Sequence, residues 1–316
     1  MNESIKSKSS FTLSGKLSDY MLLIKMSLSI MVVFSSVISY LLVPEVVFDW
    51  YRITLLFIGG MLVTGSANSI NQVVEKNSDA LMKRTAKRPV AAGRMSETEG
   101  WAFAIITGVA GVLILAIFFN ILSALLAAFS LFLYSFIYTP LKKVNSIAVL
   151  VGAFPGALPC LIGWAAGADE LSIGGWVLFA LQFLWQFPHF WAIAWVAHKD
   201  YSNAGFKLLP SEQGPTKYTA LQTIVYSLLM IPVGMIPYYI GMSGMTSLII
   251  VMLTNLFLVM QCFRLYKEMS AKAARRVMFS SYIHLPVVLL ALLMDKVPSP
   301  EGGLGSILKM AHSLFV

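Results

Sequence analysis

The sequence has little charge and almost no cysteine. Only 12% of its 316 residues are charged, whereas 58% are hydrophobic, which leaves too few charges to cover the surface of a soluble protein of this length. The two cysteines, Cys160 and Cys262, both lie inside apolar stretches. A disulfide framework and a thiolate metal site are therefore both excluded. The composition leaves a protein whose surface faces lipid.

Long apolar runs are what the sequence has in abundance. Windows of about 19 residues predict nine membrane-spanning helices, at 21–43, 53–71, 101–119, 121–139, 147–166, 176–197, 218–240, 245–266 and 277–294. No small-residue cleavage site follows the first run, which favours a retained helix over a signal peptide. We expect an all-α membrane protein with one transmembrane domain over 21–294, a polar N-terminal tail at 1–20 and a short C-terminal tail at 295–316.

The basic residues are distributed unequally between the two sides of this predicted bundle. One side, which includes the N-terminus, carries 19 of the 23 lysines and arginines, and Lys25 falls inside the first span. The positive-inside rule then places the N-terminus in the cytoplasm and the C-terminus outside, in an inner (cell) membrane. This topology also explains the net charge of +8, so membrane lipid is an expected partner and nucleic acid is not.

The end of the second span carries polar side chains along one helical face. Asn68, Asn71, Gln72, Glu75 and Asp79 fall within an arc of roughly 100° at helical spacing. Two carboxylates one turn apart, preceded by amide oxygens, offer the hard ligands that Mg²⁺ prefers. The alternative is that these residues only cap a helix that emerges into water.

Four cations follow within ten residues of Asp79, in the run from Lys83 to Arg88. Lysine and arginine bind phosphate oxygens, and the arginine fork suits them well. Carboxylates beside such cations are the parts that bind a diphosphate and stabilise it as it leaves. Tyr138 and Lys142, at the end of the fourth span, have groups that can also reach phosphate, although an ordinary basic loop explains the lysine equally well.

A second polar row lies on the sixth span, where Gln182, Gln186 and His189 share one face. Pro188 removes a helical hydrogen bond there and predicts a kink beside the histidine. Asp200 follows on the cytoplasmic side, where it could complete a two-sided cage for a metal–diphosphate. The alternatives are a buried structural histidine and an ordinary loop acid.

These residues resemble the motifs of the UbiA-type intramembrane prenyltransferases, over residues 20 to 295. The family's motif Asn-Asp-x-x-Asp-x-x-x-Asp is matched by Asn71-Gln72-x-x-Glu75-x-x-x-Asp79, in which Gln72 and Glu75 depart from it. Pro188-His189 stands where quinone-forming members usually carry an aspartate. That difference indicates the branch of the family that acts on heme.

The resemblance implies a nine-helix bundle around a central cavity and an Mg²⁺-dependent transfer of farnesyl from farnesyl diphosphate to a vinyl group of heme b, with addition of water. Heme is then a substrate and not a retained cofactor, and proteins that accept the farnesylated heme are possible partners. The implied site residues are Asn71, Glu75, Asp79 and Asp200 as catalytic metal ligands, Lys83, Arg84, Arg88, Lys142 and Tyr138 for diphosphate, and His189 and Gln186 for heme.

Three other functions have to be compared with this one. The same fold could act on an aromatic or quinone precursor, although His189 argues against that acceptor. A secondary transporter would show inverted repeats and charges at mid-depth, whereas no repeat is evident and the acids gather at one face. A purely structural membrane protein would leave the polar row of the second span unexplained.

Overall fold

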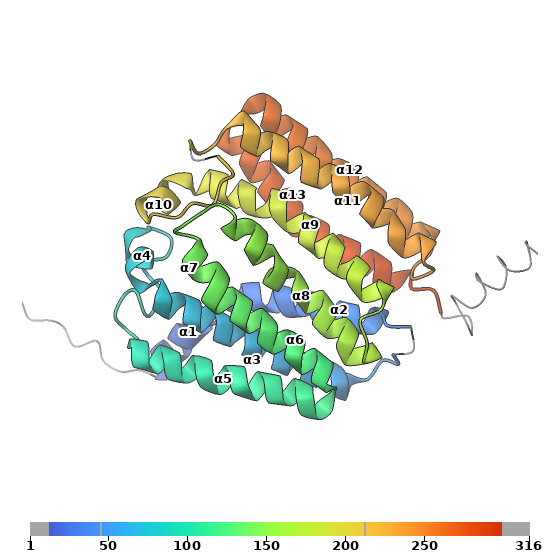
Figure 1. Cartoon of the computed structure of the whole chain (residues 1–316), viewed down its shortest axis with the longest axis horizontal. Coiled ribbons are helices and arrows are strands. Elements are labelled where there is room, and N and C mark those ends of the chain that lie inside the picture. Colours follow the sequence, from blue (N-terminus) through green and yellow to red (C-terminus); the bar gives the residue numbers. More distant parts are fainter. Residues whose placement is uncertain (1–12, 45, 212, 299–316) are drawn as a thin grey trace, which may run out of the picture.

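The computed structural model describes residues 13–44, 46–211 and 213–298, and within them the chain forms a helical bundle (Figure 1). The helices are α1 Leu13–Leu23, α2 Met26–Leu42, α3 Trp50–Val74, α4 Lys76–Leu81, α5 Glu97–Phe118, α6 Ile121–Phe132, the π-helix η1 Leu133–Tyr138, α7 Thr139–Leu141, α8 Ala148–Ala168, α9 Ile173–Val196, α10 His198–Asn203, α11 Lys217–Tyr239, α12 Met245–Glu268 and α13 Ala271–Met294.

Within the described residues, eight helices are long and apolar enough to cross a membrane, and the number rises to nine if one bent pair of helices counts as a single span. That pair is α1 and α2, which is bent by 50°. The segment Ile121–Leu141, which comprises α6, η1 and α7, counts as one of the eight. The predicted all-α membrane fold is confirmed, the predicted nine spans are reached when α1 and α2 count as one, and the protein is an integral multi-pass membrane protein.

The first span differs from the prediction because it begins earlier and is broken. Helix α1 starts at Leu13, inside the segment predicted to be a tail. It is anchored to the start of α5 by an ion pair of 2.8 Å between Lys16 Nζ and Glu99 Oε1. The break falls at Lys25, which adopts the left-handed conformation with φ of 50°. The predicted tail at 295–316 lies mostly outside the described residues.

Two of the five polar residues predicted on one face of the second span stabilise this break. Backbone carbonyls at a helix break inside a membrane need other donors. The Gln72 side-chain amide donates to the carbonyls of Leu22 and Leu23, at 2.9 and 2.8 Å. The Asn68 amide donates to the carbonyl of Ile24 at 3.1 Å. Asn68 and Gln72 therefore have a structural function. The other three residues of the polar row are Asn71, Glu75 and Asp79.

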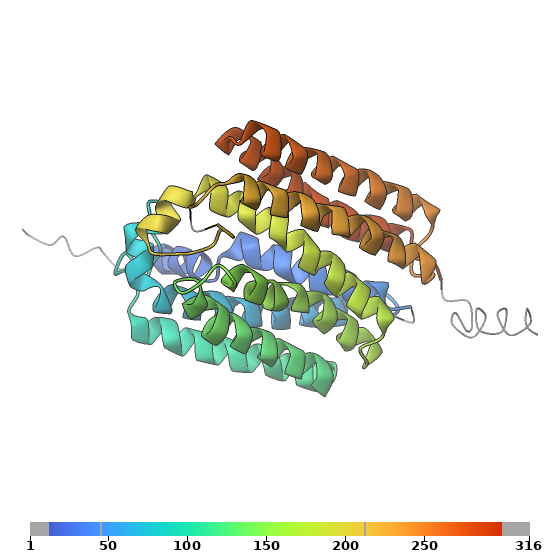
Figure 2. The same cartoon turned by 45° about the horizontal axis from the view of Figure 1, so that its top comes forward.

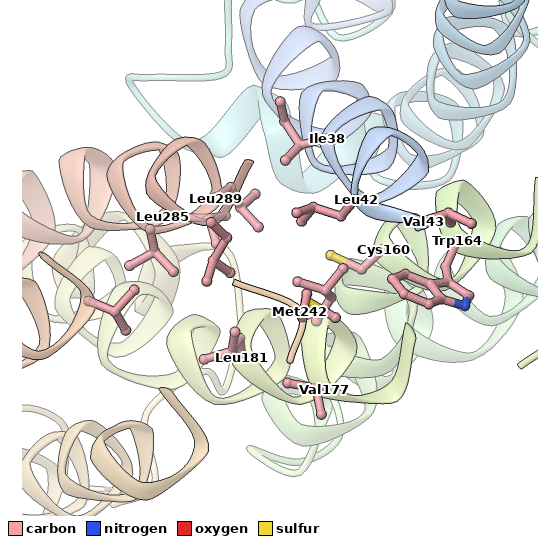
Figure 3. Packing of buried hydrophobic residues seen from close by; sticks show 14 residues of the cluster. Ile38, Leu42, Val43, Cys160, Trp164, Val177, Leu181, Met242, Leu285 and Leu289 are labelled. Carbon is pink, nitrogen blue, oxygen red and sulfur yellow. The ribbon is translucent and has the colours of Figure 1, made fainter. Parts of the chain in front are cut away.

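The core lies between α2, α8, α9 and α13, and Figure 3 shows its buried side chains meeting from these helices. The glycine-rich α8 permits this close packing, because a Cβ atom on Gly163 would lie 1.8 Å from the carbonyl oxygen of Ser36 on α2. Figures 1 and 2 both place α8 inside the bundle, between the layer of α3, α5 and α6 and the layer of α11 and α12. The glycines of α8 therefore serve helix packing.

The short helices gather at one end of the bundle. Helices α4, α7 and α10 lie together at the left of Figure 1: α7 is the last turn of the span Ile121–Leu141, and α4 and α10 each follow the end of a membrane-spanning helix. Met82 after α4 packs against Ala204 and Phe206 after α10. The backbone N–H of Lys207 donates to the Lys142 carbonyl at 2.8 Å. Loops far apart in the sequence are thus joined over one end of the bundle.

Candidate active site

A polar cavity of about 410 Å³ lies beneath these joined loops. It is lined by residues from the break in the first span, from the second, fourth, fifth, sixth and ninth spans, and from α4 and α10. Its charged and polar lining residues are Lys25, Asn71, Glu75, Asp79, Arg84, Thr85, Arg88, Tyr134, Tyr138, Lys142, His189, Tyr201 and Tyr282. The structure therefore brings together eight of the eleven site residues predicted from the sequence.

The first carboxylate, Asp79, is fully buried and paired with Arg88. Arg88 Nη1 lies 2.7 and 2.6 Å from the two carboxylate oxygens of Asp79. Burial raises the pKa of the Asp79 carboxyl, and the neighbouring Arg88 guanidinium opposes this rise. The chain changes direction at Glu75, between the end of α3 and the start of α4, and Asp79 lies on α4.

The second carboxylate, Glu75, is paired with Lys142 from the loop after α7. The Lys142 Nζ atom lies 2.5 Å from Glu75 Oε1, and both side chains are buried. Burial lowers the pKa of the Lys142 ammonium, and the nearby Glu75 carboxylate opposes this fall. The same ammonium lies 4.8 Å from the ring centroid of Tyr138. This cluster fixes the end of the fourth span against α3.

A third cation, Lys25, was missed by the sequence analysis. Its Nζ atom donates to the Asn71 side-chain oxygen at 3.0 Å, and it lines the cavity. The left-handed conformation at the break allows this side chain to leave the helical path. The sequence did contain a signal for Lys25, which is a single charged residue inside an apolar run. Such a residue in a membrane span usually faces a polar interior.

The charges of the lining favour an anionic ligand. Four cations, Lys25, Arg84, Arg88 and Lys142, outnumber the two carboxylates, which gives the lining a formal charge of +2. Each of the three predicted oxygen ligands has a cation at hydrogen-bond or ion-pair distance: Asn71 has Lys25, Asp79 has Arg88 and Glu75 has Lys142. A diphosphate carries the opposite charge to this surplus and is well matched to lysine and arginine donors.

The donor set also fits Mg²⁺. Asn71, Glu75 and Asp79 present amide and carboxylate oxygens to one cavity. Within the described ranges, no group of three or more His, Cys, Asp or Glu side chains is placed to hold a metal ion. The lining has two carboxylates, Glu75 and Asp79, and Mg²⁺ commonly binds through one or two carboxylates and completes its shell with water and substrate oxygens.

Arg84 and Tyr201 join the loop after α4 to α10. Arg84 Nη2 lies 3.2 Å from the Tyr201 hydroxyl oxygen, and its guanidinium carbon lies 5.8 Å from the centre of the ring. Burial raises the pKa of the Tyr201 phenol, with the Arg84 guanidinium opposing the rise. Both residues line the cavity. They form part of its wall on the side away from the membrane-spanning helices.

Three predicted site residues lie outside this cavity. Lys83 is exposed, and Asp200 is only half-buried on α10. The chain bends at Ala197, where α9 gives way to α10, and Tyr201 lines the cavity in place of Asp200. Asp200 therefore does not line the cavity, where the two-sided cage predicted from the sequence would require it. Gln186 is also buried away from the cavity.

Gln186 joins two helices. Its side-chain amide donates to the Ala153 carbonyl on α8 at 2.9 Å, and the lack of a side chain at Gly156 leaves room for it. The Gln182 amide makes the equivalent bond to the Gly156 carbonyl at 2.7 Å. These two glutamines fix α9 on α8. Within the polar row of the sixth span, Gln182 and Gln186 are therefore structural, and His189 is the exception.

That last member, His189, lines the cavity from α9. Its Nδ1 atom lies 2.8 Å from the Ser281 hydroxyl oxygen on α13. The Trp185 ring stacks on the imidazole, with centroids 4.5 Å apart and an angle of 20° between the planes. The imidazole is thus held in one orientation at the cavity wall.

A second, apolar cavity of about 100 Å³ adjoins the first. The two share Leu28 and Tyr134 in their linings. Its remaining lining comes from α2, α3, α5, α6 and α8 and is dominated by small and aliphatic residues, including Val32, Val33, Val63, Ala67, Ala127, Gly156 and Ile162. A ligand with a charged head and an apolar tail could therefore extend from one cavity into the other.

Comparisons with known proteins agree with this architecture. The model of the UbiA prenyltransferase family matches residues 32–283. A protein of Cytophaga hutchinsonii named protoheme IX farnesyltransferase is 46% identical over 278 residues, which cover 88% of this chain and 97% of that protein.

Two solved structures share the fold. One comes from work on the biosynthesis of digeranylgeranylglyceryl phosphate synthase in membranes, with a TM-score of 0.74, 21% identity and coverage of 89% of this chain and 98% of that one. The other is a UbiA homologue from Archaeoglobus fulgidus bound to GPP and Mg²⁺, with a TM-score of 0.65, 15% identity and coverage of 87% and 99%. The chain belongs to the UbiA prenyltransferase family.

Proposed function

We propose that this protein transfers farnesyl from farnesyl diphosphate to a vinyl group of heme b, with addition of water, to give heme O and diphosphate. One observation carries the proposal. A cavity with a surplus of cations and two buried carboxylates adjoins an apolar cavity, and a histidine faces the polar cavity from another wall. The name of the Cytophaga hutchinsonii relative supports the choice of acceptor.

The head of the prenyl diphosphate is proposed to bind in the polar cavity. Lys25, Arg84, Arg88 and Lys142 supply its oxygens with donors. Asn71, Glu75 and Asp79 are proposed to hold Mg²⁺, which when bound neutralises charge on the diphosphate and so weakens the carbon–oxygen bond. Arg88 and Lys142 are paired with these carboxylates in the structure. Both pairings are expected to loosen when metal and substrate bind, which turns the cations toward phosphate.

The electron flow follows from this arrangement. The carbon–oxygen bond of the allylic diphosphate breaks, and its electron pair leaves with the diphosphate. The π electrons of the heme vinyl group attack the allylic carbon and form the new carbon–carbon bond. Water then adds to the resulting cation on the heme side chain and loses a proton. One farnesyl diphosphate, one heme b and one water are consumed in each turnover.

The walls around the junction of the cavities suit a carbocation. Tyr134 lines both cavities and Tyr138 lines the polar one, and aromatic faces attract a cation by about 0.5 to 2 kcal/mol. The apolar cavity would hold the isoprenoid tail away from water, so that water does not reach the allylic carbon before the vinyl group does.

We also propose that the end of the bundle with the polar cavity faces the cytoplasm. Helices α4, α7 and α10 lie at this end (Figure 1), and the loops that contain or follow them are among the basic loops of the sequence. The positive-inside rule places such loops on the cytoplasmic side. A reporter fused to the C-terminus should therefore be active only outside the cytoplasm, and a reporter that is active inside would contradict this orientation.

The direct test is an activity assay with purified protein in lipid nanodiscs. Farnesyl diphosphate, heme b and Mg²⁺ should give heme O by mass spectrometry, and chelation with EDTA should stop the reaction. The same protein should not prenylate 4-hydroxybenzoate. Prenylation of that aromatic acid with no conversion of heme would instead show that the acceptor is a quinone precursor.

A further inference from the structure

We infer that His189 binds the heme iron through its Nε2 atom, and that Ser281 is the positioning residue that keeps this atom available. The inference rests on the proposed function, in which heme b is the acceptor. It deepens that proposal because it selects the iron over a heme propionate as the group that His189 contacts. Ser281 is assigned no role by the sequence motifs.

The hydrogen bonds around Ser281 determine which nitrogen of His189 carries the proton. The Ser281 hydroxyl oxygen lies 2.6 Å from the Met278 carbonyl oxygen on the same helix. Two oxygens approach so closely only when a hydrogen lies between them, so the single hydroxyl hydrogen of Ser281 is donated to Met278. Toward His189 the hydroxyl can then only accept. The Nδ1 atom of His189, 2.8 Å away, is therefore the N–H donor.

The other ring nitrogen is left with a free lone pair. A neutral imidazole with its proton on Nδ1 has an acceptor at Nε2. His189 lines the polar cavity, and none of the hydrogen bonds among the described residues involves its Nε2 atom. A lone pair binds iron, whereas a propionate carboxylate would require an N–H donor at this position. The tautomer therefore favours the iron.

The ring is also held in a fixed orientation. Trp185, one turn before His189 on α9, stacks on the imidazole and donates its indole N–H to the Ser281 carbonyl at 2.9 Å. Ser281 thus contacts both residues, through its hydroxyl and through its backbone. Ligating histidines in proteins usually donate their second N–H to a hydrogen-bond acceptor, most often a carboxylate, a backbone carbonyl or water, and this sets the tautomer and the orientation of the ring. The Ser281 hydroxyl is the acceptor in that position here.

The second buried histidine of the bundle shows the contrasting arrangement. His284 Nε2 lies 2.8 Å from the Asn255 side-chain oxygen, and the Asn255 amide donates to the Met230 carbonyl at 2.9 Å. His284 lines neither cavity described above. Its polar contacts link α11, α12 and α13 and are structural. Burial alone does not distinguish the two histidines, whereas access to the polar cavity does.

The test is spectroscopic and uses the full-length protein in nanodiscs with heme b. The wild-type protein should show the absorption and electron paramagnetic resonance signature of iron with a histidine ligand. His189→Ala and His189→Gln should both lose this signature, and added imidazole should restore it in the alanine variant. Two variants are used so that a failure of one to fold does not prevent the test.

The role of Ser281 is tested with two substitutions of this residue and with a control substitution at another buried serine. Ser281→Ala should weaken heme binding by about 10- to 100-fold, the range typical for the hydrogen-bond partner of a ligating histidine, and Ser281→Thr should retain wild-type affinity. Ser227→Ala is the matched control, since Ser227 is also buried and also donates to the carbonyl three residues earlier, away from either cavity. It should leave the heme spectrum unchanged.

The outcomes separate this inference from the proposed function. If the His189 variants keep the wild-type ligand signature while the protein still makes heme O, the ligand assignment is wrong and the farnesyl transfer stands. An unchanged heme affinity in Ser281→Ala would likewise overturn the positioning role. If the wild-type protein binds no heme and prenylates a different acceptor, both the inference and the proposed function fail.

Discussion

Glu75 and Lys142 form an ion pair of 2.5 Å between the end of α3 and the loop after α7, and both side chains are buried in the wall of the polar cavity. Neither charge can be removed alone without leaving the other buried and unpaired, which is costly in a protein interior. The pair therefore fixes the fourth span against the second. It also holds a cation where a diphosphate can reach it.

Replacing Lys142 with methionine should lower kcat/KM for farnesyl diphosphate by at least about 100-fold, because one buried charge-assisted contact is lost. It should also destabilise the protein by about 3 to 5 kcal/mol, since Glu75 is left without its partner. Steady-state kinetics and thermal unfolding in detergent measure the two effects. Lys143→Met is the matched control, because Lys143 is exposed and does not line the cavity.

The double variant Lys142→Met with Glu75→Gln separates the two roles of the pair. Removing both charges should restore much of the stability, since no unpaired charge remains. It should leave activity as low as in the single variant, because the cavity has lost both a phosphate donor and a carboxylate. Recovery of activity together with stability would mean that the pair acts only in folding.

Asp79 and Asp200 provide a direct comparison of two acids. Asp79 is buried in the cavity and paired with Arg88, whereas Asp200 lies outside the lining. Asp79→Asn should therefore reduce kcat by about 1,000-fold or more at saturating Mg²⁺, since it removes a carboxylate from the proposed metal site. Asp200→Asn should change kcat by less than about threefold. Equal losses in the two variants would support the two-sided cage that the sequence suggested.

The sequence predicted much of this fold because its dominant signal is simple. Apolar runs long enough to cross a bilayer are visible without any knowledge of packing, and the polar row at the end of the second span marks the cavity. Asn71, Glu75 and Asp79 could be identified because helical periodicity puts them in one arc, and all three line the cavity although α3 ends and α4 begins around Glu75. Arg84, Arg88 and Lys142 could be identified from their nearness to these acids or to the end of a span.

The remaining assignments required tertiary structure. Periodicity could not show that Gln72 faces the break at Lys25 and not the cavity, because nothing in the sequence marks where the first span bends. The same limit applies to the adjacent residues Asp200 and Tyr201, because only the structure shows that α9 ends at Ala197 and that Tyr201, not Asp200, lines the cavity. Ser281 has no motif around it, and only its contact with His189 identifies it.

The structural role of Gln72 leads to a prediction about stability. Gln72→Glu keeps the shape of the side chain but replaces the amide donor with an acceptor that faces the carbonyls of Leu22 and Leu23. The loss of these bonds in a buried site should destabilise the protein by about 1 to 3 kcal/mol, observed as a lower melting temperature in detergent. The kcat of the folded fraction should remain within about threefold of the wild type. A large loss of kcat at an unchanged melting temperature would place Gln72 in the chemistry.

The apolar cavity leads to a prediction about the length of the isoprenoid. Ala67 lines this cavity from α3, so the larger side chain in Ala67→Leu would occupy space proposed for the distal part of the tail. The kcat/KM for farnesyl diphosphate should fall by about 10-fold or more, whereas that for the shorter geranyl diphosphate should change less, because fewer of its carbons reach this position.

Ala102→Leu makes the same substitution at an exposed position on α5 and should leave the ratio of the two kcat/KM values unchanged. Competition between the two diphosphates in one reaction measures this ratio directly. An equal loss for both substrates would mean that the tail does not enter this cavity.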